Sequence, residues 1–191
     1  SVNLATAFAE AGSKVLLIDA DVRSPSVSKK LGIEGTVGLT HLITNTVSSH
    51  DAIQRYWKPN FHVLPAGKQS LNPSILLNSR AMRALVDQVS KAYDYVIIDT
   101  DPMQLSNDAA VFAKEGPQLL VVASLGITEK KTLKQTDQEL HTLDIQPIGL
   151  AINYAEPEKP QKSGYYYYGE DTDENGKKRQ SQHKKSGKAK D

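Results

Sequence analysis

The sequence predicts an α/β fold in which helices cover both faces of a parallel β-sheet. Segments with helical spacing of apolar residues alternate along the chain with short runs of Val, Ile and Leu. These runs are nearly uninterrupted, as is typical of strands that are buried on both faces of a sheet. Ligands of such folds bind beyond the carboxyl ends of the strands, so functional residues are expected at that edge.

In the first half of the chain, two predicted strands lie between helical segments. Residues 1–12 have helical spacing and end at Gly12, a residue suited to a helix C-cap. Residues 15–18 are the first apolar run and predict a buried strand. Residues 37–54 predict one helix or two short ones, and residues 61–67 predict a second strand that stops at its proline and glycine.

The second half continues the alternation. Residues 72–93 have one apolar face and carry Pro73 in the first turn, which predicts a single long amphipathic helix. Residues 94–102 contain the next apolar run and predict the third strand. The remaining elements are expected to be a short helix at 106–116, a strand at 118–126, a helix at 129–145 and a strand at 147–157.

Length and composition limit the possible classes of protein. A chain of 191 residues suits one globular domain with a single core, which we assign to residues 1–154. The absence of cysteine excludes disulfides, thiolate metal sites and cysteine nucleophiles. No apolar run approaches the roughly 20 residues of a membrane-spanning helix, and no secretory signal pattern is present, so we expect a cytoplasmic chain.

Residues 155–191 differ in composition and are predicted to form a disordered tail. They are rich in Gly, Ser, Lys, Gln and Asp, and they include the consecutive tyrosines Tyr165, Tyr166, Tyr167 and Tyr168. The basic end, residues 177–191, could bind nucleic acid or an anionic membrane through nonspecific charge. We favour a solvated tail and expect no nucleic-acid partner, because no base-stacking or groove-reading motif accompanies the lysines.

Aspartates follow two of the predicted strands. Asp19 and Asp21 come after the first apolar run, and Asp99 ends the third. Because the carboxyl ends of parallel strands meet at one edge, these carboxylates should gather there and could hold Mg²⁺ together with phosphate oxygens. Either of the first two could instead end the strand or cap the next helix. Two strands that each end in an apolar run plus aspartate favour a nucleotide site.

Two other chemistries are set aside. The histidines lack the close spacing of a zinc site, and the serines near Asp21 lack the strand-turn-helix pattern G-x-S-x-G of a hydrolase. We expect structural or surface roles for the histidines. They are His41, His50, His62, His141 and His183.

The two acidic motifs resemble those of a known family. LLIDADVRSP (residues 16–25) resembles the modified second nucleotide motif of the bacterial tyrosine kinases that control capsular and exopolysaccharide synthesis. VIIDTDP (residues 96–102) resembles their Walker B motif. The resemblance covers residues 1–154 in order, including SVNLATAFAEAG, HVLPAGK, NPSILL and YDYVIIDT, and it extends to the tyrosine-rich tail.

The resemblance implies a P-loop NTPase fold, related to deviant Walker ATPases such as MinD, and transfer of the ATP γ-phosphoryl group to protein tyrosine. Asp21 would accept the proton of a tyrosine hydroxyl, which with a pKa near ~10 is a poor nucleophile at neutral pH. Asp19 and Asp99 would position Mg²⁺ and its waters. Arg23 and Asn153 would contact the nucleotide, although an asparagine at a strand end is also a common turn residue.

The resemblance also implies substrates and partners. The tyrosine-rich tail would be autophosphorylated, which makes Tyr165 to Tyr168 the expected phosphorylation sites. In the two-component form of the family, a separate cytoplasmic kinase chain is activated by a transmembrane polysaccharide co-polymerase adaptor. This chain would therefore act at the inner face of the membrane through that partner. Self-association of the full-length protein is expected as well.

The sequence departs from the family in several places. A phosphate-binding loop, G-x-x-x-x-G-K-[ST], should stand directly before Ser1, and without it the chain should bind ATP poorly or not at all. N-terminal truncation is favoured over degeneration, because a helix that opens without a preceding cap is an unusual start. Asp101 stands where the family usually has a second proline, and Ile75 stands where glutamate is common.

Two other functions stay open. A related ATPase of the partitioning or cell-division type would hydrolyse ATP to switch between monomer and dimer. A catalytically degenerate scaffold would keep the partner surface without catalysis. The run GYYYYGED at residues 164–171 favours the kinase, because such ATPases need no tyrosine-rich tail.

Overall fold

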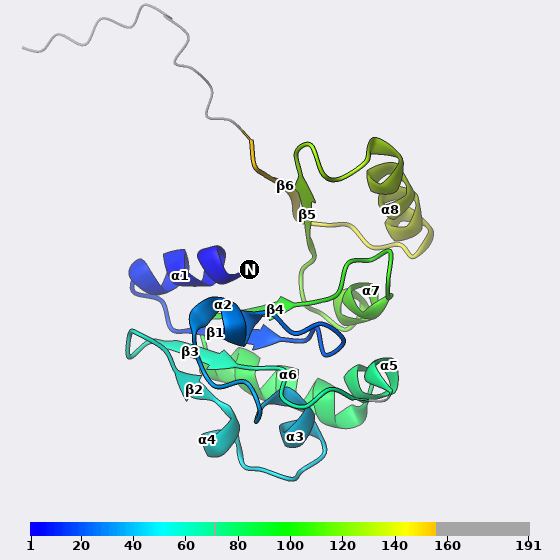
Figure 1. Cartoon of the computed structure of the whole chain (residues 1–191). Helices are drawn as coiled ribbons and strands as arrows, with labels where there is room; N and C mark the ends of the chain where they lie inside the picture. Colours follow the sequence, from blue (N-terminus) through cyan, green and yellow to red (C-terminus); the bar gives the residue numbers. More distant parts are fainter. Residues whose placement is uncertain (71, 156–191) are drawn as a thin grey trace, which may run out of the picture. The chain divides into compact units, whose positions relative to one another are not determined.

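A computed structural model of the chain describes residues 1–70 and 72–155, in which helices and strands alternate as predicted (Figure 1). The strands are β1 (Val15–Asp19), β2 (Gln54–Arg55), β3 (Phe61–Leu64), β4 (Tyr95–Asp99), β5 (Leu120–Ser124) and β6 (Gly149–Asn153). The helices are α1 (Val2–Glu10), α2 (Val27–Leu31), α3 (Leu39–Ile43), α4 (Ser49–Ala52), α5 (Pro73–Leu77), α6 (Arg80–Ala92), α7 (Asp108–Lys114) and α8 (Lys130–Thr142). The predicted tyrosine-rich tail lies outside the described residues, so the assignment of a domain and a tail stays a prediction.

The main sheet has the strand order β2-β3-β1-β4. β1 is parallel to both β3 and β4, and the short β2 is antiparallel to β3 at the edge. All five residues of β1 are buried. A strand with a hydrogen-bonded neighbour on each side and helices on each face must be apolar along its whole length, which is why its sequence shows no alternation.

Side chains of β1 alternate between two separate hydrophobic clusters. Leu16 and Ile18 pack with Leu39 of α3 and Met82 of α6 on one face of the sheet. Val15 and Leu17 pack on the other face with Phe61 of β3, Val27 of α2, and Ala5 and Ala9 of α1. Figure 1 shows α1 and α6 on opposite sides of β1 and β4. Helices therefore cover both faces of this sheet, as predicted, and they hold its carboxyl edge in place.

β5 and β6 depart from the expected single sheet. Among the described residues they pair in parallel only with each other. One face packs on a small cluster that includes Leu140 of α8. Side chains on the other face stay exposed, with Val122 at 61% and Ile152 at 56%. The expectation that helices cover both faces of every strand is thus wrong for β5 and β6, because no described element packs on their second face.

The long helix expected over residues 72–93 is also divided. α5 begins with Pro73 at its first position and ends at Leu77, and α6 begins after Ser79. The Ser79 hydroxyl accepts a hydrogen bond from the backbone N–H of Met82 at 3.2 Å, so it caps a new helix. The segment 37–54 forms the second of the two expected alternatives, since it contains the short helices α3 and α4. Within the described residues, no helix combines the length and hydropathy that crossing a bilayer requires.

Candidate functional site

The carboxyl ends of β1 and β4 bring two predicted site residues together. The register of these parallel strands pairs Asp19 directly with Asp99. The Ser1 hydroxyl donates a hydrogen bond to Asp99, so the start of α1 reaches the same edge. The expected juxtaposition of Asp19 and Asp99 is therefore present, and it follows from two five-residue strands that stop at the same level of the sheet.

Asp19 has one occupied and one free carboxylate oxygen. Its Oδ2 accepts hydrogen bonds from the backbone N–H groups of Ser26 at 3.2 Å and Val27 at 3.0 Å, at the start of α2. Its Oδ1 is buried and has no hydrogen-bond partner. The alternative that this aspartate caps the next helix is thus true of one oxygen, and the other oxygen remains available to a ligand.

The protonation of Asp19 reflects its position. Burial raises the pKa of Asp19 from its ordinary value of 3.8 to about 6, and the nearby charges of Asp99 and Asp21 add to this rise. The hydrogen bonds from Val27 and Ser26 oppose the rise because they stabilise the charged form. A buried carboxylate that is held at this cost and keeps an unpaired oxygen is typical of a functional site.

Asp21, the candidate base, lies in the turn after β1. Its Oδ1 accepts a hydrogen bond from the backbone N–H of Ser24 at 2.7 Å, which fixes the side chain in an Asx-type turn. Its carboxylate is also close enough to raise the pKa of Asp101, which lies in the loop after β4. The half-buried Asp21 thus stands between the loops that follow β1 and β4.

Arg23 binds three side chains from distant parts of the chain. Its Nη1 donates to Asp101 and, at 2.8 Å, to Asp108, and its Nη2 donates to Ser74 at 2.8 Å. The hydrogen bond to Asp108 is the main reason why the pKa of Arg23 is raised. Burial and the neighbouring carboxylate of Asp21 raise the pKa of Asp101 to about 6, and Arg23 opposes that rise. The role of Arg23 as a nucleotide ligand stays a prediction.

Asp108 and Ser74 were not identified from the sequence. Asp108 is in the first turn of α7, where an acidic residue is explained by the helix dipole alone. Ser74 is in the first turn of α5. Both are more than fifty residues from Arg23 along the chain, so no local signal could have shown that they meet it.

Asn153 lies apart from the aspartates. It is exposed at the end of β6, where it pairs in register with Ser124 of β5. Its backbone carbonyl accepts a hydrogen bond from the N–H of Leu125 at 2.9 Å. In the described part of the chain no hydrogen bond joins it to Asp19, Asp21 or Asp99, and its predicted contact with a nucleotide is untested. Tyr165 to Tyr168 lie outside the described residues.

The carboxylate edge suits a magnesium ion that is shared with phosphate. Within residues 1–70 and 72–155, no group of three or more histidine or acidic side chains is arranged to hold a metal ion by itself. Asp19, with its free buried oxygen, and Asp99 offer two carboxylates side by side. Mg²⁺ commonly takes one or two protein carboxylates and fills its remaining positions with water and phosphate oxygens. The donor set therefore fits Mg²⁺ in a nucleotide complex.

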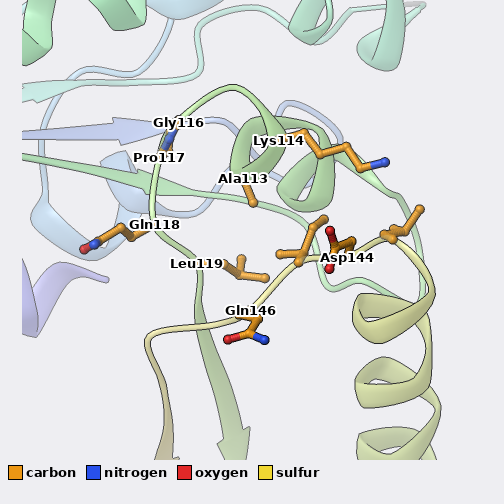
Figure 2. A pocket seen from close by; sticks show the side chains of 10 residues that line it. Ala113, Lys114, Gly116, Pro117, Gln118, Leu119, Asp144 and Gln146 are labelled. Atoms are coloured by element: carbon orange, nitrogen blue, oxygen red, sulfur yellow. The ribbon is translucent and has the colours of Figure 1, made fainter.

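One cavity lies elsewhere in the described residues. A depression of about 500 Å³ opens between the loops that enter β5 and β6, as Figure 2 shows. It lies at the amino ends of these strands, opposite the end that carries Asn153. The lining residues are Ala113, Lys114, Gly116, Pro117, Gln118, Leu119, Leu143, Asp144, Ile145 and Gln146. This depression is therefore separate from the carboxylate edge.

Comparisons with known proteins identify relatives of the whole described region. The AAA domain family matches residues 1–140. Tyrosine-protein kinase YwqD of Bacillus subtilis (strain 168) is 36% identical over 166 residues, which are 87% of this chain and 70% of that protein. The putative tyrosine-protein kinase CapB of Staphylococcus aureus is 32% identical over 171 residues, which are 90% of this chain and 75% of that protein.

Solved structures give the same result for the fold. The crystal structure of the chimerical protein CapA2B2 matches with a TM-score of 0.78 and 30% identity, and the match covers 82% of this chain and 69% of that one. The septum site-determining protein MinD from Pyrococcus horikoshii OT3, solved with Mg-ADP, matches with a TM-score of 0.63 and 24% identity over 82% of this chain and 64% of that one. The predicted fold class, an α/β fold of the P-loop NTPase type, is confirmed.

Proposed function

The chain belongs to the family of bacterial tyrosine kinases, and we propose that it transfers the γ-phosphoryl group of ATP to protein tyrosine. The observation that carries the proposal is the in-register pair of Asp19 and Asp99, with one buried Asp19 oxygen left free and Asp21 beside the pair. Rigid strands fix these carboxylates at the edge where α/β folds bind ligands. Phosphoryl transfer depends mainly on such positioning and on charge stabilisation.

Each carboxylate has a distinct proposed role. Asp21 accepts the proton of the tyrosine hydroxyl as the tyrosine oxygen bonds to phosphorus and the bond to ADP breaks. Asp19 and Asp99 hold Mg²⁺, which neutralises charge on the phosphates when it is bound. The turn hydrogen bond from Ser24 keeps the Asp21 carboxylate oriented for this step. Asn153 is proposed to contact the nucleotide from the end of β6.

The proposed substrates are Tyr165 to Tyr168. They stand between glycines in GYYYYGED, followed by acidic residues, a composition that lets an extended segment enter an active site. Each phosphate would add about −1.5 to −2 charges at neutral pH, which is enough to change how this segment binds a basic partner. Autophosphorylation at these positions would therefore act as a charge switch.

We place this activity in the synthesis and export of capsular or exopolysaccharide. The family resemblance supports a transmembrane polysaccharide co-polymerase adaptor that recruits the chain to the inner face of the membrane. Relatives named CapB and the chimerical protein CapA2B2 are in keeping with such a system. Self-association of the full-length protein is part of the same proposal.

A phosphotyrosine assay tests the proposal. The protein would be produced with a phosphate-binding loop, G-x-x-x-x-G-K-[ST], ahead of Ser1 and incubated with ATP and Mg²⁺. Asp21→Asn should lower the rate of tyrosine phosphorylation by about 10² or more, the usual contribution of a general base. Asp137→Asn makes the same chemical change at an exposed position of α8 and should leave the rate unchanged.

The same assay distinguishes the alternatives. Undiminished labelling in Asp21→Asn would remove this residue as the base. ATP hydrolysis without phosphotyrosine would instead support the partitioning or cell-division type of ATPase, whose fold MinD shares with this chain. A protein that neither binds nor hydrolyses ATP would support the scaffold.

A further inference from the structure

The contacts of Arg23 join four segments of the chain. Arg23 itself is in the loop after β1, and its partners lie in the loop after β4, at the start of α7 and at the start of α5. The Asp101 and Asp108 side chains are only 2% and 4% exposed, and the Arg23 side chain is 30% exposed. One guanidinium thus pairs with two carboxylates that are almost completely out of contact with solvent.

We propose that Arg23, Asp101 and Asp108 form an ion-pair clamp that positions Asp21 for proton acceptance, and that Arg23 is a positioning residue rather than a nucleotide ligand. The inference rests on the proposed kinase function, because it assigns a task at the same site. It differs from the expectation that Arg23 contacts the nucleotide.

The clamp acts on Asp21 from two sides. Arg23 is two residues after Asp21 in the loop that follows β1, and Asp101, in the loop that follows β4, lies close enough to Asp21 for their charges to interact. An ion pair between Arg23 and Asp101 therefore fixes the distance between these loops and the place of Asp21 between them. Without the clamp, the turn hydrogen bond from Ser24 would hold Asp21 within its own loop only.

Three of the five N–H donors of the Arg23 guanidinium serve other side chains. Nη1 serves both buried carboxylates and Nη2 serves Ser74, while the backbone carbonyl of Arg23 accepts a hydrogen bond from Gln69 at 2.9 Å. A guanidinium that turned away from these partners towards a phosphate would leave two buried carboxylates unpaired, which is strongly unfavourable. Lysine cannot replace it, because an ammonium group lacks the planar fork that reaches three partners at once.

Steady-state kinetics of the protein that carries the phosphate-binding loop test the clamp. Arg23→Lys keeps the charge and loses the fork, so kcat for tyrosine phosphorylation should fall by about 10- to 100-fold, as expected when a catalytic group is misplaced. The KM for ATP and the Kd of a fluorescent ATP analogue should change less than about twofold, because the contacts that bind ATP before the reaction are unaffected. Arg83→Lys is the matched control, since Arg83 forms an ion pair with Glu115 at 2.6 Å and, among the described residues, makes no hydrogen bond to Asp19, Asp21 or Asp99.

Two further variants complete the test. Asp108→Asn should reproduce the loss of kcat, and Asp108→Glu, which restores a carboxylate, should recover part of it. If Arg23→Lys does not fold, Ser74→Ala removes one exposed contact of the guanidinium and gives the same comparison at smaller amplitude.

The outcomes separate the two proposals. A rise of KM and of the analogue Kd with unchanged kcat in Arg23→Lys would make Arg23 a nucleotide ligand and overturn the clamp. An equal loss of kcat in the Arg83→Lys control would also overturn it. A parent protein that forms no phosphotyrosine overturns the proposed function itself, and the clamp as a device for Asp21 is then lost with it.

Discussion

Asp19→Asn should make the metal-free protein more stable at neutral pH, although it removes a proposed functional residue. Asp19 is fully buried, and its Oδ1 has no hydrogen-bond partner. Asparagine has nearly the same shape, and its carbonyl oxygen can still accept the hydrogen bonds that Oδ2 receives from Ser26 and Val27. The substitution therefore removes the cost of a buried charge and keeps the capping contact.

The size of the effect follows from the pKa of Asp19, which is raised from 3.8 to about 6 by burial. A raised pKa means that the folded protein holds this proton to higher pH than the unfolded chain does. The favourable contribution of Asp19 to the free energy of unfolding is complete below pH 3.8, and it is lost as the pH rises through 6. At roughly 1.4 kcal/mol for each pKa unit, the ionised carboxylate costs about 3 kcal/mol at neutral pH.

Urea unfolding of both proteins between pH 4 and pH 8 in the presence of a metal chelator measures this cost. The free energy of unfolding of Asp19→Asn minus that of the parent should grow by about 2 kcal/mol from pH 4 to pH 8, because part of the cost is already present at pH 4. Asp137→Asn at an exposed site should show no such growth. A difference that stays constant across this pH range would refute the link between the buried carboxylate and stability.

Two further substitutions test the packing around the site by urea unfolding. Ser79→Ala should lower the free energy of unfolding by about 1 kcal/mol, because it removes the cap of α6. Ser90→Ala, within the same helix, should not lower it. Equal losses in the two variants would argue against the cap. Gly38→Ala should cost about 1–3 kcal/mol, because a Cβ there would lie 2.0 Å from the carbonyl oxygen of Pro65. Gly149→Ala, where the nearest atom to the new Cβ is 3.8 Å away, should leave the free energy of unfolding unchanged. A Gly38→Ala protein of normal stability would show that the loop at Gly38 can move.

The central strands could be predicted from sequence because their burial leaves a direct mark. β1 and β4 are buried or half-buried runs that end at Asp19 and Asp99, and the polar end of each run shows where the sheet stops. Parallel pairing then places both aspartates at one edge without further information. This part of the candidate site follows from strand physics alone.

Other features leave no local mark. The apolar spacing from α5 to α6 continues across Asn78 and Ser79, so periodicity could not show that a cap divides the two helices. The partners of Arg23 come from distant segments, and only tertiary packing brings them together. The exposed face of β5 and β6 is as apolar in sequence as a buried one. The composition of a strand therefore does not reveal whether another element covers it.

That exposed face has a practical consequence for handling the protein. The outward side chains of β5 and β6 are Leu120, Val122, Leu150 and Ile152, and neither strand contains a charged residue. Uncharged apolar strands of this kind lack the gatekeeper charges that prevent self-adhesion of β-structure. Self-association through this face is therefore expected to increase with protein concentration. Each kinetic or unfolding experiment should be accompanied by light scattering across a dilution series. A lysine at Val122 would be the first change to make if the protein precipitates.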